Sequence, residues 1–138
     1  MSPPPVEYLD AEPSGLAAMI GGLIEGNLSA HPERALLLKP AVVGIVATDA
    51  GVAITVRLSR SRITVADGLL GRHQVVVETD SETLTELSSA PLRFGFPDAM
   101  TEDGRAVTRK LVRGSLKVRG LVRHPGLVSR LNRLLSVA

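Results

Sequence analysis

Four consecutive β-strand patterns in the middle of the chain limit its possible folds most strongly. Residues 41–48 form a continuous apolar run rich in β-branched side chains, which is typical of a central strand. Apolar and polar residues alternate over 53–59 and again from residue 63, so each segment predicts a strand with one buried face. Short turns separate these three segments and predict a meander, and residues 73–78 predict a fourth strand after a crossover.

Helical patterns lie on both sides of these strands. Before them, apolar residues recur at helical spacing over 16–24, which predicts a helix with a broad apolar face. After them, Thr-Asp-Ser-Glu at 79–82 fits a capping box, and Thr-Glu-Asp at 101–103 begins a second helix with acids in its first turn. A short strand over 114–120 and a leucine-rich helix over 127–135 follow. The complete order is α-β-β-β-crossover-β-α-α-β-α, an α+β arrangement.

Length and composition favour one domain with an aliphatic core. A chain of 138 residues is large enough to bury one substantial core. Residues 1–13 contain four of the nine prolines and no periodic pattern, so we expect a flexible Pro-rich arm followed by one domain over 14–138. Only Tyr8, Phe94 and Phe96 are aromatic, which leaves the core to aliphatic side chains. The sequence has no cysteine, no secretion-type leader and no apolar stretch of ~20 residues, so we expect a cytoplasmic protein.

The charges are distributed very unevenly along the sequence. Residues 105–138 contain nine basic side chains and no acidic one, whereas residues 1–104 contain 14 acidic and seven basic side chains. The basic segment is either a solvated face balanced by acids elsewhere or a contact surface for anionic lipid, to which each nearby Lys or Arg contributes around 1 kcal/mol. We expect no nucleic-acid partner, because the sequence has no recognition motif and too few aromatic residues to stack bases.

The sequence contains no recognisable catalytic, cofactor or metal site. None of the three histidines has the spacing of a metal-binding motif. Asp80, Glu82 and Glu86 are the candidates for acid–base chemistry, yet they lie at a predicted helix start, where the helix dipole favours acids for structural reasons. We therefore expect a protein that binds rather than catalyses.

Two motifs resemble the sterol carrier protein 2 (SCP-2) family of lipid-transfer domains. Residues 80–87 read DSETLTEL, and residues 114–120 read GSLKVRG. Members of the family carry a D-x-E-T-L-x-x-L-like helix after a strand, then G-x-L-K-I-x-G and a terminal helix that ends in leucines. The resemblance covers residues 14–138, and the basic, Ala- and Arg-rich composition suits a bacterial, actinobacterial-like stand-alone member. The terminal Ser-Val-Ala differs from the Ser-Lys-Leu address of peroxisomal members.

The resemblance implies a five-stranded mixed β-sheet with helices packed on one face and an apolar tunnel between the two layers. It implies a non-catalytic carrier that binds a sterol, a fatty acid or a fatty acyl-CoA in that tunnel. The alternative is an interaction module of the same fold, whose cavity is filled and whose C-terminal helix binds a protein partner. A continuous apolar pocket of at least ~300 Å³ would favour the carrier, and a solid core would favour the module.

The aliphatic faces of the predicted helices supply the candidate lipid-binding residues. We expect the tunnel wall to contain Met19, Ile20, Leu23, Ile24, Leu84, Leu87, Phe94, Phe96, Met100, Leu127, Leu131 and Leu134. Flexible Met and Leu side chains suit a variable apolar guest. For contact with lipid head groups or a membrane surface we expect Arg119, Arg123, Arg130 and Arg133, with Arg109 and Arg113 as further candidates.

Overall fold

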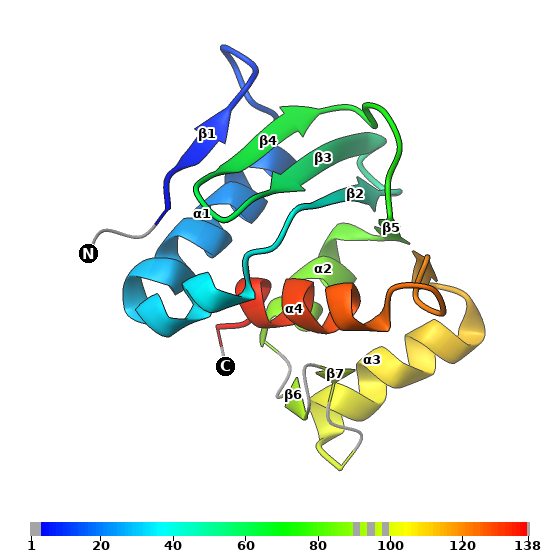
Figure 1. The fold of residues 1–138 in the computed structure, drawn as a ribbon. Coiled ribbons are helices and arrows are strands. Elements are labelled where there is room, and N and C mark those ends of the chain that lie inside the picture. The colour runs from blue at the N-terminus through cyan, green and yellow to red at the C-terminus, as the bar shows by residue number, and fades with distance from the viewer. Residues whose placement is uncertain (1–3, 90–91, 94–95, 98–99, 138) are drawn as a thin grey trace.

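A computed structural model of the chain describes residues 4–89, 92–93, 96–97 and 100–137. Strands and helices follow one another in nearly the order expected (Figure 1). In chain order the elements are β1 (Val6–Tyr8), α1 (Gly15–Ala30), the 3-10 helix η1 (Pro32–Leu37), β2 (Ala41–Ala47), β3 (Val52–Leu58), β4 (Ile63–Asp67), β5 (Val75–Thr79), α2 (Ser81–Ser89), β6 (Leu92–Arg93), β7 (Phe96–Pro97), α3 (Glu102–Arg113), β8 (Lys117–Arg119) and α4 (Pro125–Leu135).

Six of the strands form one mixed sheet in the order β1-β4-β3-β2-β5-β8. β2, β3 and β4 are the antiparallel meander, in which Val56 lies between Val43 and Val65. β5 crosses over to pair parallel with β2, and β8 pairs antiparallel with β5 and forms one edge. The short strands β6 and β7 pair with each other outside this sheet.

The core lies between one face of the sheet and the helices. Alternate residues of each strand point to this face, and Val43, Ile54 and Val65 are fully buried there. Figure 1 shows α1, α2 and α4 on the same side of the sheet. Ser14 is the N-cap residue of α1, and its hydroxyl accepts a hydrogen bond from the backbone N–H of Ala17 at 3.1 Å. The helix is rich in glycine, and the packing of its buried face against the core stabilises it.

The sheet has six strands rather than the five expected, because part of the predicted N-terminal arm forms β1 beside β4. The backbone N–H of Ile63 donates to the Pro5 carbonyl at 3.0 Å, next to the paired residues. The Tyr8 ring lies over Gly21 of α1, where a Cβ would collide with the phenol. A tertiary contact therefore holds this short strand, and no periodic pattern in the sequence predicts it.

The helices after the sheet begin and end close to their predicted positions. Asp80, rather than Thr79 as the capping box suggested, caps α2, because its carboxylate accepts the Thr83 N–H at 2.7 Å. The hydroxyl of Thr101 caps α3 in the same way. α3 ends at Gly114, which adopts the left-handed conformation with φ of 80°.

The C-terminal helix α4 packs on the core beside α1. Leu127, Leu131 and Leu134 are at most 3% exposed. The side-chain amide of Asn27 in α1 donates to the Leu134 carbonyl at 2.8 Å, which satisfies a backbone group that the end of the helix leaves open. The first and last long helices of the chain are therefore joined by both apolar packing and a buried hydrogen bond.

No helix within the described residues combines the length and the apolar character needed to cross a bilayer.

Candidate functional site

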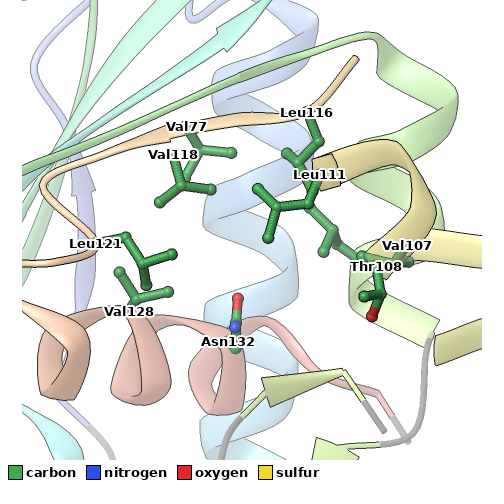
Figure 2. A pocket seen from close by; sticks show the side chains of 10 residues that line it. Val77, Val107, Thr108, Leu111, Leu116, Val118, Leu121, Val128 and Asn132 are labelled. Carbon is green, nitrogen blue, oxygen red and sulfur yellow. The ribbon is translucent and has the colours of Figure 1, made fainter. Parts of the chain in front are cut away.

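An apolar pocket of about 160 Å³ lies between the β5–β8 edge of the sheet and helices α2, α3 and α4 (Figure 2). Eight of its ten described lining residues are aliphatic, two are polar and none is charged. The lining consists of Val77, Leu87, Val107, Thr108, Leu111, Leu116, Val118, Leu121, Val128 and Asn132. In Figure 2 the labelled side chains surround a common space. Such a lining accepts an apolar guest.

The periodicity of the strands and helices directs these side chains into the pocket. Val77 of β5 and Val118 of β8 are cross-strand partners on the helix side of the sheet. Val107 and Leu111 are one turn apart on α3, so they lie on the same face of that helix. Val107 is 2% exposed, whereas Leu111 is 39% exposed. The pocket therefore opens toward solvent on the side of Leu111.

A narrower cavity of about 20 Å³ lies next to the pocket and reaches α1 and β2. The two spaces share Val77, Leu87 and Asn132, so these side chains form the partition between them. A space of this size holds about one water-sized group. A longer guest would have to displace the partition, and the flexible, partly buried Leu87 is its most adaptable aliphatic member.

Five of the predicted wall residues line these two cavities. Leu87 lines both, and the narrower cavity is also lined by Ile20, Leu23, Leu84 and Leu131. Four more belong to the core beside them: Met19, Ile24, Leu127 and Leu134. The predicted wall thus surrounds the space next to α1, whereas the larger pocket lies further along the sheet, beside β8 and α3.

Three predicted wall residues on the segment between α2 and α3 do not contribute to the described pocket lining. Met100 is 79% exposed and lines neither cavity, contrary to the prediction, because it lies in the turn just before the N-cap residue of α3. Phe94 and the side chain of Phe96 lie outside the described residues.

The sequence prediction did not include most residues of the larger pocket. Val77 and Val118 occupy inward positions of their strands, which the period-two pattern could have indicated. The four-residue spacing of Val107 and Leu111 indicates one apolar face of a helix, but nothing in the sequence places that helix beside β8. The pocket depends on this long-range placement.

The six predicted head-group arginines occupy three separate places. Two lie on α3 (Arg109 and Arg113), two on α4 (Arg130 and Arg133), and two at the end of β8 and in the turn after it (Arg119 and Arg123). Arg119 forms an ion pair with Glu78 of β5 at 2.9 Å. None of the six lines the apolar pocket.

Two of the three carboxylates considered for acid–base chemistry, Asp80 and Glu86, have structural partners. The hydrogen bond from the Thr83 N–H holds the pKa of Asp80 below its ordinary value. Glu86 accepts a hydrogen bond from Lys110 of α3 at 2.9 Å, and this bond raises the pKa of Lys110. Lys110 also donates to the Thr83 hydroxyl at 3.0 Å. It therefore links α3 to α2 along one side of the pocket.

Neither the models of known protein families nor the sequences of curated proteins match this chain. Its fold is similar to a solved structure described as "UbiJ-SCP2 Ubiquinone synthesis protein". The two share a TM-score of 0.61 at 16% sequence identity, over 87% of this chain and 92% of that one. A likeness at this identity shows a common fold alone. The chain has the SCP-2-like α+β fold that its two sequence motifs predicted.

Proposed function

We propose that this protein is a non-catalytic lipid-binding domain that holds a linear hydrocarbon chain between the sheet edge and helices α2, α3 and α4. The apolar pocket itself is the observation on which the proposal rests, because its described lining is uncharged, mainly aliphatic and open to solvent on one side. The SCP-2-like fold supports the same function. A fatty acid or a fatty acyl-CoA is the ligand class that we favour.

The size of the pocket favours a single chain over a sterol. A volume of about 160 Å³ is below the ~300 Å³ set above as the criterion for a carrier, so the described pocket does not meet that criterion, although the structure is not the solid core expected of an interaction module either. At about 30 Å³ for each water-sized group, the pocket holds about five methylene groups. Their transfer from water contributes about 4 kcal/mol, which corresponds to a millimolar Kd. The narrower cavity beyond Leu87 adds room for about one more group, or about 0.8 kcal/mol, so tighter binding requires the side chains around it to move apart.

The burial of α4 argues against the alternative of an interaction module that binds a protein through its C-terminal helix. Leu127, Leu131 and Leu134 pack in the core at 3% exposure or less. A partner helix in a groove needs an apolar face that is open to it. The apolar side chains of α4 already contact α1 and the sheet side of the core.

The structural use of the acidic residues supports binding without catalysis. Asp80 caps α2 and Glu86 pairs with Lys110, so each carboxylate has a partner unrelated to a ligand. The described pocket lining offers only Thr108 and Asn132 as polar side chains. The hydroxyl of Thr108 donates to the Gly104 carbonyl at 2.9 Å.

Titration with saturated fatty acids of increasing chain length tests this function, combined with native mass spectrometry of the purified protein. Val118→Phe adds a ring inside the pocket, and Val122→Phe adds the same ring to a side chain that is 94% exposed. We expect affinity to rise by about 0.8 kcal/mol for each added methylene until the cavities are full. Val118→Phe should weaken binding at least about tenfold, whereas Val122→Phe should leave it unchanged. Chain-length-independent binding that both variants retain would contradict the proposal.

The proposal includes a transient contact with anionic membrane through the arginines of α3 and α4, of which Arg109, Arg113 and Arg133 are exposed. Nine basic and no acidic side chains occur after residue 104, and each one near an anionic leaflet contributes around 1 kcal/mol. Co-sedimentation at low salt should therefore favour anionic over neutral vesicles. Arg109→Gln with Arg113→Gln should reduce that preference, and equal binding to both kinds of vesicle would rule out the contact.

A further inference from the structure

A cleft of about 560 Å³ opens on the outer face of the sheet, at the β5–β8 edge. Arg72, His73 and Gln74 line it from the segment before β5, and Arg119, Arg123 and His124 line it from the end of β8 and the following turn. Val76 and Arg119 are cross-strand partners in this cleft, whereas their neighbours Val77 and Val118 line the apolar pocket. Because adjacent strand residues point to opposite faces, the two sites are separated by the sheet.

Two contacts hold the segments of the cleft together. Gln74 is fixed to β2, because its side-chain oxygen accepts the Val42 N–H at 2.7 Å and its own N–H donates to the Val42 carbonyl at 2.9 Å. Gly120 has a φ of 84° and lies directly against the Gln74 carbonyl, where any Cβ would collide. The contact between Gly120 and Gln74 therefore holds side by side the two segments that carry Arg72 and Arg123.

The ring of His73 is oriented by a second set of hydrogen bonds. The Thr55 hydroxyl donates to the Gly68 carbonyl at 2.7 Å. A hydroxyl has a single proton, so in the 3.0 Å contact between Thr55 Oγ1 and His73 Nε2 the ring nitrogen is the donor. In the neutral ring this leaves Nδ1 as an acceptor, so the N–H donors for an oxyanion in the cleft come from the arginines.

Positive charge in the cleft is only partly compensated. Arg72 and Arg123 are exposed and form no ion pair with any described residue. Arg119 pairs with Glu78 at 2.9 Å, which uses part of the five N–H donors of its guanidinium. None of the described residues that line the cleft is acidic.

The first turn of α4 adds to this positive potential. His124 is its N-cap residue, and within the described part of the chain the first turn has neither a side-chain cap nor an acid. The guanidinium of Arg130 folds back over this turn, with Nη1 3.5 Å from the position that a Cβ would take on Gly126. The helix dipole disfavours a cation at this end and favours an anion.

We infer that this cleft binds a phosphate-class oxyanion. Guanidinium groups pair with phosphate oxygens through two parallel hydrogen bonds, and three of them line this cleft. Its volume lies within the ~300–1,000 Å³ that is usual for small-molecule sites. The phosphate belongs either to a soluble phosphate ester or to a lipid head group, which present the same oxyanion chemistry. The inference does not depend on lipid occupying the apolar pocket.

NMR titration of the full chain with inorganic pyrophosphate, at physiological ionic strength, tests the soluble source. We expect saturable shifts of the backbone amides of His73, Gly120 and His124, which line the cleft. Combining Arg72→Gln with Arg123→Gln should raise the Kd for pyrophosphate at least about tenfold, since each substitution removes a charge-assisted hydrogen-bonded pair with the oxyanion. Arg60→Gln, at an exposed arginine between β3 and β4, is the control and should change the Kd less than about twofold.

Vesicles of phosphatidylcholine with and without phosphatidic acid test the head-group source. Binding to phosphatidic acid that the double variant loses and the control retains would assign the site to a lipid phosphate. Pyrophosphate binding with the same pattern, without vesicle binding, would assign it to a soluble phosphate ester. The inference fails if neither probe binds, or if Arg60→Gln weakens binding as much as the double variant.

Discussion

Replacing Gly120 by alanine should destabilise this protein much more than the same change at Gly114. Both glycines have a positive φ, 84° and 80° respectively, so alanine is strained at each position. No atom outside the immediate neighbours lies within 4 Å of a Cβ at Gly114, whereas a Cβ at Gly120 would overlap the Gln74 carbonyl oxygen. That oxygen belongs to the backbone leading into β5, so either the strand or the turn would have to move.

The magnitudes of the two effects can be separated. A left-handed conformation costs an alanine about 1–2 kcal/mol, of which about 0.4–1 kcal/mol is recovered because alanine restricts the unfolded chain. We therefore expect Gly114→Ala to lower the free energy of unfolding by about 1 kcal/mol. Overpacking typically adds about 1–3 kcal/mol. Gly120→Ala should accordingly cost about 2–4 kcal/mol, with a fall in Tm of about 3–4 °C for each kcal/mol in a domain of this size.

Urea denaturation followed by circular dichroism measures both variants under identical conditions. The midpoints should differ while the slope of the unfolding free energy against urea stays constant, which shows that stability alone has changed. A loss for Gly120→Ala no greater than that for Gly114→Ala would refute the close packing of the turn against Gln74. The rigid link between the two sides of the cationic cleft would be refuted with it.

Two further predictions concern β1 and the start of α2. Gly22→Ala should stabilise the protein by up to about 1 kcal/mol, because nothing lies within 4 Å of the new Cβ and alanine is the better helix former. Gly21→Ala should instead destabilise the protein, because the new Cβ would displace Tyr8. If the urea midpoints of the two variants moved in the same direction, the packing of β1 on α1 would be contradicted. Because the Thr83 N–H lowers the pKa of Asp80, the charged cap contributes stability above the ordinary value of 3.8 that is lost as the pH falls through the lowered one. The stability difference between the wild type and Asp80→Asn, measured by urea denaturation from pH 7 to pH 2, should therefore shrink with acidification, and a difference that grew would contradict this role.

The elements with a strong repeating pattern were predictable from the sequence. β2 is a continuous apolar run, the next strands and β5 alternate buried and more exposed residues, and α1 and α4 have apolar faces at helical spacing. β1 was not predictable, because three residues carry too little periodicity and proline-rich flanks indicate a loop. Only the fit of Tyr8 over Gly21 and the pairing with β4 define it as a strand.

The candidate sites were predictable in character but only partly in position. The sequence indicated an aliphatic wall, and Leu87 lies in it, yet the larger pocket is built from Val77, Val118 and the inner face of α3. The charge count indicated a basic C-terminal segment, yet the cleft combines two of its arginines with Arg72, which lies 47 residues before Arg119 in the chain. No spacing rule connects residues that far apart.

The sequence by itself determined the order of the elements, the aliphatic nature of the core and the resemblance to SCP-2 domains, because each follows from local periodicity, composition or a short motif. Only the tertiary structure decided where the apolar side chains leave a pocket between them and where the arginines line a cleft. Periodicity assigns a side chain to a face of its own strand or helix. The volume and charge between two faces depend on how segments distant in the chain pack together, here α3 against β8 and the 120–124 turn against Gln74.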